Sequence, residues 1–208
     1  MNTPTKSPQT QGTTITIMRS WKMAALEVGA IIFSVIFALM LSEWWQGLEE
    51  RAHHTRVLEL IQSELASNRD ELAESITYYE RMIESLRPLM SNDSVTQQEL
   101  LAIEGCCNMG LGGNNRNAYE TGAHIGLFTA LDPELSNTIV APYVGGQALA
   151  PMKEISLQSM LASDLTDTKR RISSYFIFVS VMTPAEQEIV DLIDEALLGV
   201  EAELQKRQ

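Results

Sequence analysis

The chain has 208 residues, an apolar fraction of 45% and a formal net charge of −12. This length allows one ordinary domain with an appendage and excludes a large multidomain enzyme. The acidic balance excludes an extensive nucleic-acid or anionic-lipid surface on the main body, because phosphate binding requires clustered basic side chains. The only two cysteines, Cys106 and Cys107, are neighbours, which excludes the disulfide framework of a small secreted protein.

The N-terminal segment differs from the rest of the chain in charge. Residues 1–20 are mostly polar and are interrupted by prolines, so they are predicted to form a tail without a core. Residues 1–22 contain three basic residues and no acid, which gives a charge of +3. Because the whole chain carries −12, residues 23–208 carry −15. The two sides of the apolar stretch that follows therefore have opposite charge.

Residues 21–45 contain this apolar stretch. From Ala24 to Leu41 there are 18 residues whose only charge is Glu27, close to the length that crosses a hydrocarbon core of about 30 Å. Three interpretations are open: a cleaved signal peptide, a buried core helix and a retained anchor. The small residues that a signal peptidase needs are absent after the stretch, where Leu39, Met40 and Leu41 stand, so we predict a retained transmembrane helix over 21–45.

Tryptophans at both ends support the anchor. Trp21 and Trp44 are 23 residues apart, about 35 Å of helix, which matches the spacing of two interfacial aromatic belts. Trp45 is predicted to join Trp44 as an interfacial anchor. Because Lys and Arg gather before the span and acids after it, the positive-inside rule predicts a cytoplasmic N-terminus, with residues 46–208 outside, in the periplasm of a Gram-negative cell.

Small residues recur every fourth position within the span, at Ala30, Ser34, Ala38 and Ser42. This spacing predicts a face on which a second helix packs closely, although such residues also recur by chance. Glu27 is the other notable residue in the span. Its carboxylate either reaches the cytoplasmic headgroups or is protonated, or it pairs with a cation or polar group on a neighbouring helix.

Helical spacing of apolar residues continues beyond the span, which predicts a long juxtamembrane helix over 46–88 that Pro88 stops. Asn68 lies within this apolar stripe, either as a tolerated or cap-like polar residue or as a residue that fixes register in an oligomer. Later helices of the chain, a sister chain, or both must cover the stripe. Its members are Leu48, Ala52, Leu58, Ile61, Leu65, Leu72, Ile76, Tyr79, Ile83 and Leu86.

Residues 89–208 are predicted to form a helical extracytoplasmic domain, which makes the fold all-α: a transmembrane helix that continues into the long helix, packed with shorter helices as a bundle. Thr96 to Glu99 read as a capping box, and the helix there is expected to end at Gly105. Further expectations are a helix over 118–131, a helix that Asp132 caps with Pro133 in its first turn, a break at Gly145 and Gly146, and a last helix that begins at Thr183 and Pro184.

No pattern in the sequence indicates a catalytic, cofactor or metal site. His53 and His54 are adjacent, unlike a metal-binding i, i+4 pair, and His124 stands alone. The segment GLGGNN lacks the phosphate-binding glycine spacing. Cys106 and Cys107 are open to a structural or redox-silent role, a strained vicinal disulfide or an interchain bridge. The chain is therefore expected to be no enzyme and to hold no cofactor.

Two stretches carry a resemblance. The run Leu26-Glu27-Val28, Ala38-Leu39 and Trp44-Trp45, followed by Leu58, Glu64-Leu65 and Asn68, resembles an uncharacterised bacterial family of single-pass inner-membrane proteins with a helical exterior domain. The stretch RNAYETGAHIGLFTALDPEL is similar to the family's second motif through Tyr119, Gly126 and Asp132-Pro133-Glu134-Leu135, with Gly122 as a departure. The resemblance implies anchor and architecture, and no activity.

These observations predict a non-enzymatic, single-pass protein of the bacterial inner membrane, a structural or accessory subunit that assembles through helix–helix association. Its expected partners are membrane lipid and other membrane-protein subunits or further copies of itself, and no nucleic acid. An extracytoplasmic sensor or ligand-binding bundle that signals through a partner is the alternative. A membrane-anchored enzyme is the third reading.

Overall fold

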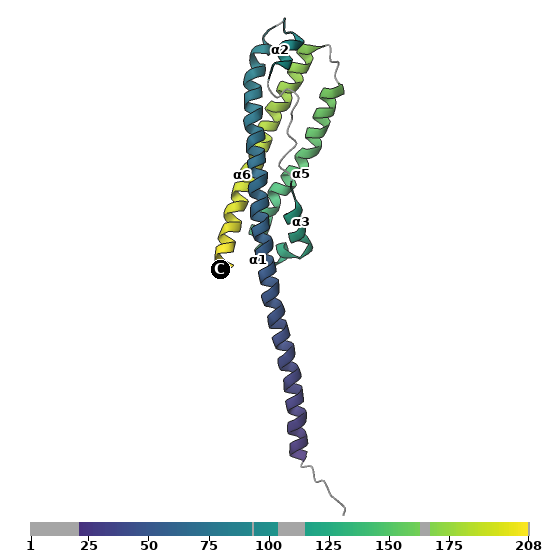
Figure 1. The fold of residues 1–208 in the computed structure, drawn as a ribbon, viewed down its shortest axis with the longest axis vertical. Helices are drawn as coiled ribbons and strands as arrows, with labels where there is room; N and C mark the ends of the chain where they lie inside the picture. Colours follow the sequence, from purple (N-terminus) through teal and green to yellow (C-terminus); the bar gives the residue numbers. More distant parts are fainter. Residues whose placement is uncertain (1–20, 93, 104–114, 163–166, 208) are drawn as a thin grey trace, which may run out of the picture. The chain divides into compact units, whose positions relative to one another are not determined.

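The computed structural model describes residues 21–92, 94–103, 115–162 and 167–207, and every regular element among them is an α-helix (Figure 1). The predicted all-α fold is confirmed. Two compact units divide the chain, Met1–Glu49 and Glu50–Gln208, and their boundary lies within the first helix. In chain order the helices are α1 (Trp21–Met90), α2 (Gln97–Leu101), α3 (Asn117–His124), α4 (Leu127–Ala130), α5 (Pro133–Ala162) and α6 (Thr168–Arg207).

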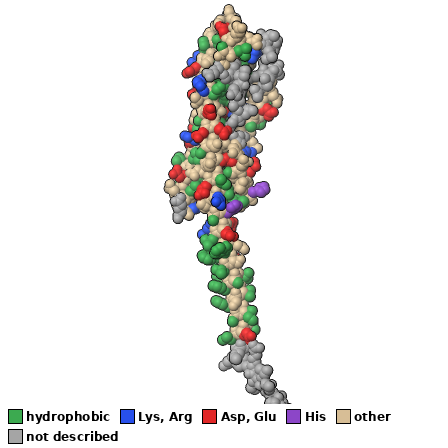
Figure 2. Space-filling view, in the orientation of Figure 1, with side chains coloured by type: hydrophobic (Ala, Val, Ile, Leu, Met, Phe, Trp, Pro, Cys, Tyr) green, Lys and Arg blue, Asp and Glu red, His purple; other side chains and the backbone are tan. Residues whose placement is uncertain are grey.

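The described part of the first unit is the N-terminal part of α1, and none of it is covered. Every side chain from residue 25 to residue 46 is exposed, although most are apolar. Figure 2 shows hydrophobic side chains around this part of the helix. Among the described residues, α1 is the one helix that is long and apolar enough to cross a membrane.

In the second unit, the apolar stripe of α1 is covered by helices of the same chain. The first core cluster joins α1 to α3, α4, α5 and the C-terminal half of α6. From the predicted stripe, Leu58, Ile61, Leu65 and Leu72 lie in this cluster, whereas Leu48 and Ala52 are exposed. The sequence left open whether later helices of the chain, a sister chain, or both cover the stripe. In this structure later helices of the same chain cover it.

A second core cluster lies further along α1. Tyr79, Met82 and Leu86 pack there against Leu100 of α2 and against the N-terminal half of α6. Because Arg69 contacts Asp194 and Tyr79 contacts Glu186, α6 runs antiparallel to α1. Two cores in series thus hold α6 along residues 57–86 of α1.

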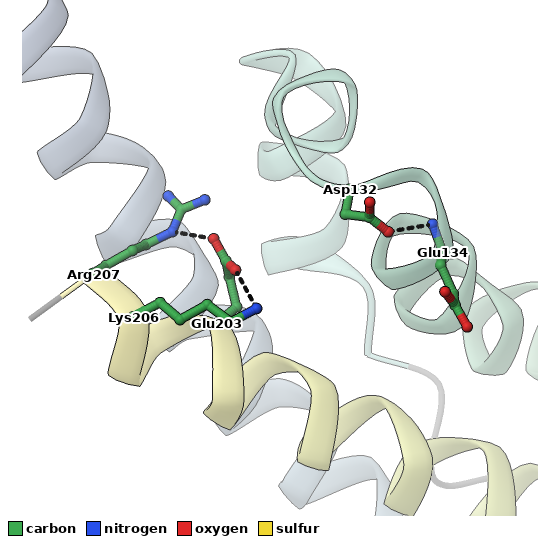
Figure 3. Close-up of polar contacts among 5 residues, drawn as sticks. All are labelled: Asp132, Glu134, Glu203, Lys206 and Arg207. Carbon is green, nitrogen blue, oxygen red and sulfur yellow. Dashed lines mark hydrogen bonds and ion pairs between the residues drawn. The ribbon is translucent and has the colours of Figure 1, made fainter.

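Two helix starts follow the predicted capping chemistry. At α2, Thr96 Oγ1 accepts a hydrogen bond from the backbone N–H of Glu99, and the Glu99 carboxylate accepts one from the N–H of Thr96. The carboxylate of Glu99 accepts from the Thr96 N–H and also from the Thr96 hydroxyl, and these two bonds lower the pKa of the Glu99 carboxyl. At α5, Asp132 Oδ1 accepts from the N–H of Glu134 at 2.9 Å (Figure 3). In the last turn of α6, Glu203 forms ion pairs within the helix. Its carboxylate lies 2.8 Å from Arg207 Nε and 3.7 Å from Lys206 Nζ (Figure 3).

Five expected boundaries were wrong. The helix that was expected to end at Gly105 ends at Leu101. α5 continues through Gly145 and Gly146, and α6 begins at Thr168 and continues through Pro184. Buried residues on both sides of Pro184 hold its helix in place, which outweighs the one backbone hydrogen bond that proline removes. α1 likewise passes Pro88 and ends at Met90. The helix expected over 118–131 is instead divided, because Gly126 adopts the left-handed conformation with φ of 73°.

Candidate functional site

The exposed apolar segment of α1 is the first candidate site. Large hydrophobic side chains here are more than half exposed almost without exception, for example Phe33 at 70% and Leu26 at 76%. Such contiguous apolar exposure on a soluble surface is unusual and marks contact with lipid or protein. Trp44 and Trp45, the predicted interfacial anchors, are 62% and 60% exposed at the end of this segment. The side chain of Trp21 lies outside the described residues.

The predicted small-residue face is a continuous strip of this segment. Ala30, Ser34, Ala38 and Ser42 are all exposed, and their spacing of four places them along one side of the helix. The Ser34 hydroxyl donates to the Ala30 carbonyl at 2.7 Å, so its hydrogen-bonding need is met within the helix. At Ser34 the face therefore presents small volume rather than a free polar group.

Other residues singled out by sequence have mixed outcomes. Glu27 is exposed on the same segment, and the choice between snorkelling, protonation and pairing stays a prediction. Cys106 and Cys107 lie outside the described residues. His53 and His124 are exposed while His54 is buried, and no group of three or more potential metal ligands occurs among the described residues.

A buried carboxylate to which the sequence assigned no role, and which it marked only through the resemblance, joins α1 to α3. Glu64 is 6% exposed, and its two oxygens accept hydrogen bonds from the backbone N–H groups of Ala118 at 2.7 Å and Tyr119 at 3.2 Å. The N-cap residue of α3, Arg116, makes no side-chain capping bond. Glu64 thus replaces the missing cap from another helix, and its negative charge lies at the positive end of the α3 dipole.

Tyrosines and an asparagine complete this junction. Tyr143 of α5 donates to Glu64 Oε1 at 2.9 Å, and its ring stacks on that of Tyr119 with 4.5 Å between centroids. Burial, and then the nearby Glu64 carboxylate, raise the pKa of Tyr143. Asn68 donates to the Asn115 carbonyl at 2.8 Å and accepts from the Asn115 N–H at 3.0 Å. Asn68 is therefore a cap-like polar residue, the first of the two roles that the sequence left open.

This junction brings the two stretches of the resemblance together. Leu58, Glu64, Leu65 and Asn68 come from the first stretch, and Tyr119 comes from the second. The hydrogen bonds of this junction join residues that are 47 to 79 positions apart in the sequence. In this chain these residues serve to fasten α3 and α5 to α1.

A second buried polar group lies between the two cores. Lys153 Nζ of α5 is 2.6 Å from Glu186 Oε1 of α6, and Tyr79 of α1 donates to the same oxygen at 3.3 Å. Glu186 is fully buried, and its Oε2 has no hydrogen-bond partner among the described residues. Burial raises the pKa of the Glu186 carboxyl, while the Lys153 ammonium and the Tyr79 hydroxyl act in the opposite direction. Burial and Glu186 raise the pKa of Tyr79.

Two signals in the sequence could have revealed these groups. Glu64 falls between Ile61 and Leu65 on the inward face of α1, where an unpaired carboxylate would be costly. Lys153 is the only basic residue in the 30 residues of α5. Both carboxylates accept hydrogen bonds or an ion pair from other helices of the chain, Glu64 through both oxygens and Glu186 through Oε1 alone, so both link helices to one another. No family model, curated protein or solved structure matches this chain.

Proposed function

We propose that this chain is a non-enzymatic, single-pass membrane protein that serves as a structural or accessory subunit and associates with other subunits through its membrane helix. The single observation that carries the proposal is the contrast along α1. Its side chains are exposed and mostly apolar from residue 25 to residue 46, whereas between Val57 and Leu86 its apolar stripe is buried except at Ile83, which is partly buried. One helix is thus suited to lipid in its first part and to a protein core in its second.

The location follows from charge. The net +3 of residues 1–22 and the acids that follow Ser42 favour a cytoplasmic N-terminus and an exterior helical bundle. In a bacterium with two membranes this is the inner membrane, with the bundle in the periplasm. Trp44 and Trp45 suit the outer interface of such an anchor.

The association surface is assigned to the anchor because the long stripe is used up by the chain's own bundle. Within lipid, helices associate by close packing rather than by the hydrophobic effect, and small residues permit close approach. Ala30, Ser34, Ala38 and Ser42 provide such an approach on one side of α1.

The test separates packing on this face from general changes in the span. Variants Ala38→Leu and Ala25→Leu make the same volume change on sides of the helix about 140° apart, as the spacing of 13 residues requires. Association is measured in vesicles by energy transfer between labelled copies, and by mass measurement of the detergent-extracted particle with any co-purifying subunit. Ala38→Leu is expected to weaken association, and Ala25→Leu is expected to leave it intact.

A second pair tests the nature of the contact. Because the Ser34 hydroxyl is bonded to Ala30 within the helix, Ser34→Ala should preserve association and Ser34→Leu should impair it. A strictly monomeric wild-type particle without a co-purifying protein would contradict the assembly role. Recovery of the whole chain in salt-washed aqueous fractions would contradict the anchor.

A further inference from the structure

The second unit has an open groove between two of its helices. The groove lies between α1 and α6, has a volume of about 700 Å³ and is open to solvent. The Arg69–Asp194 ion pair, with 2.6 Å between Nε and Oδ1, is among the residues that line it. Glu59 precedes Arg69 by ten residues on α1, about 15 Å of helix, which is room for nearly three turns of a docked helix.

Small residues and an exposed leucine are among the side chains that line this groove. Ser63 and Ala66 of α1 line it with small side chains, which allow another backbone to come close. Leu198 of α6 also lines the groove, and it is 69% exposed although it is a large hydrophobic residue. Covering an apolar side chain of this size by a partner is favourable in free energy, because burial removes its surface from water.

The charge of the groove selects the occupant. Glu59 and Glu201 line the groove on the same side of the Arg69–Asp194 pair, because α1 and α6 are antiparallel. Neither carboxylate has a hydrogen bond or ion pair in the described part of the chain. With Arg69 and Asp194 neutralising each other, the groove carries a net charge of −2, and its two free carboxylates are complementary to lysine or arginine.

We propose that this groove binds an amphipathic helix of a partner subunit, with leucine-type residues on one side and lysine or arginine beside them. A second copy of this chain does not fit, because residues 23–208 carry −15 and would bring further acids to an acidic groove. The inference deepens the proposed function and rests on it: the anchor brings the subunits together in the membrane, and the groove selects the basic partner outside.

The test uses the full chain in zwitterionic lipid nanodiscs and two synthetic peptides of about ten residues, each held helical by a hydrocarbon cross-link between side chains. One peptide carries leucines and lysines, and the other has glutamate in place of every lysine. Binding is followed by fluorescence anisotropy, with empty nanodiscs as the blank. Saturable binding of the lysine peptide alone is expected, and absence of binding or equal binding of the glutamate peptide would overturn the proposal.

Matched variants locate the binding. The double variant Glu59→Gln, Glu201→Gln and the double variant Glu80→Gln, Glu84→Gln remove the same charge from exposed positions, but only the first pair lines the groove. The first is expected to weaken binding at least about fivefold and the second less than about twofold, as expected for partly exposed charge pairs. If both double variants weakened peptide binding equally, the peptide would be attracted by net charge alone, which would overturn the proposal that it binds in the groove.

A hydrophobic pair supplies the second arm. Leu198→Ser in the groove should weaken binding, and Leu101→Ser on α2, also exposed, should not. If the chain does not enter nanodiscs, the proposed membrane anchor is contradicted. The same titrations with the full chain in aqueous buffer then still test the groove. Binding without membrane insertion, and insertion without binding, therefore contradict different proposals.

Discussion

The Nζ of Lys153 lies 2.6 Å from Oε1 of Glu186, and both side chains are buried. This contact joins α5 to α6 through two side chains that belong to neither of the two hydrophobic core clusters. Buried ion pairs add little net stability over an apolar pair, but removal of one partner leaves an uncompensated charge.

We predict that Lys153→Met destabilises the second unit by about 3–5 kcal/mol, because Glu186 stays buried without its cation. The double variant Lys153→Met, Glu186→Met should be more stable than the single variant, with a residual loss from the Tyr79 hydroxyl. Urea unfolding followed by circular dichroism measures both. Lys206→Met, which removes a cation 75% exposed, is the control and should cost less than about 1 kcal/mol. A single variant as stable as the double variant would contradict the prediction.

The same pair predicts a pH dependence. Because burial raises the folded-state pKa of Glu186 above its ordinary 4.5, the folded chain takes up this proton at higher pH than the unfolded chain does. The contribution of the Glu186 protonation equilibrium to the free energy of unfolding is therefore fully present below pH 4.5 and is lost as the pH rises through the folded-state pKa. Without the Lys153 ammonium, which lowers this pKa, the loss extends over a wider range.

The measurement compares Lys153→Met with Lys153→Met, Glu186→Gln. Their difference in free energy of unfolding isolates the ionisation of Glu186, and it should grow as the pH rises above 4.5. A difference that is constant between pH 4.5 and pH 8 would show that Glu186 titrates normally in the folded chain.

Glu64 yields a prediction about α3. Glu64→Ala removes the acceptor of two backbone N–H groups and of the Tyr143 hydroxyl, so we expect a loss of about 2–4 kcal/mol. Glu64→Gln keeps one acceptor oxygen and should lose roughly half as much. Glu74→Ala, at an exposed position of the same helix, should stay within about 0.5 kcal/mol of the wild type. Hydrogen exchange should locate the loss at the first turn of α3, and uniform exchange across the unit would contradict this assignment.

Two glycines should respond in opposite directions to alanine. Gly145 is helical, and a Cβ there would meet Ile189 Cγ1 at 3.4 Å, an ordinary contact, so Gly145→Ala should stabilise by about 0.5–1 kcal/mol. Gly126 has φ of 73°, and Gly126→Ala should destabilise by about 1 kcal/mol. Thermal unfolding of both variants checks the signs, and stabilisation by both would mean that Gly126 is not held in this conformation.

The sequence predicted the elements that depend on local chemistry and periodicity. The spacing of Leu58, Ile61 and Leu65 identified the buried stripe of α1, and the capping residues Thr96 and Asp132 identified the starts of α2 and α5. These signals succeed because they act within a few residues along the chain.

The wrong boundaries have the opposite cause. Gly145 and Pro184 are local helix breakers, yet contacts between α5 and α6 keep both helices continuous. The roles of Glu64 and Lys153 also depend on partners far along the chain, at Tyr143 and Glu186. A single sequence marks such residues as anomalies on an inward face or in a cation-poor helix, but it does not name their partners.

The long-range bonds of α1 have a consequence for biogenesis. Tyr79 finds its acceptor 107 residues later, and Glu64 finds its donors 54 to 79 residues later. In the proposed topology the chain emerges through a translocon, and residues 57–86 are then exposed long before α5 and α6 exist to cover them. A nascent chain stalled before residue 133 should therefore require a chaperone on the exit side of the membrane, and its release from that chaperone should follow synthesis of α6.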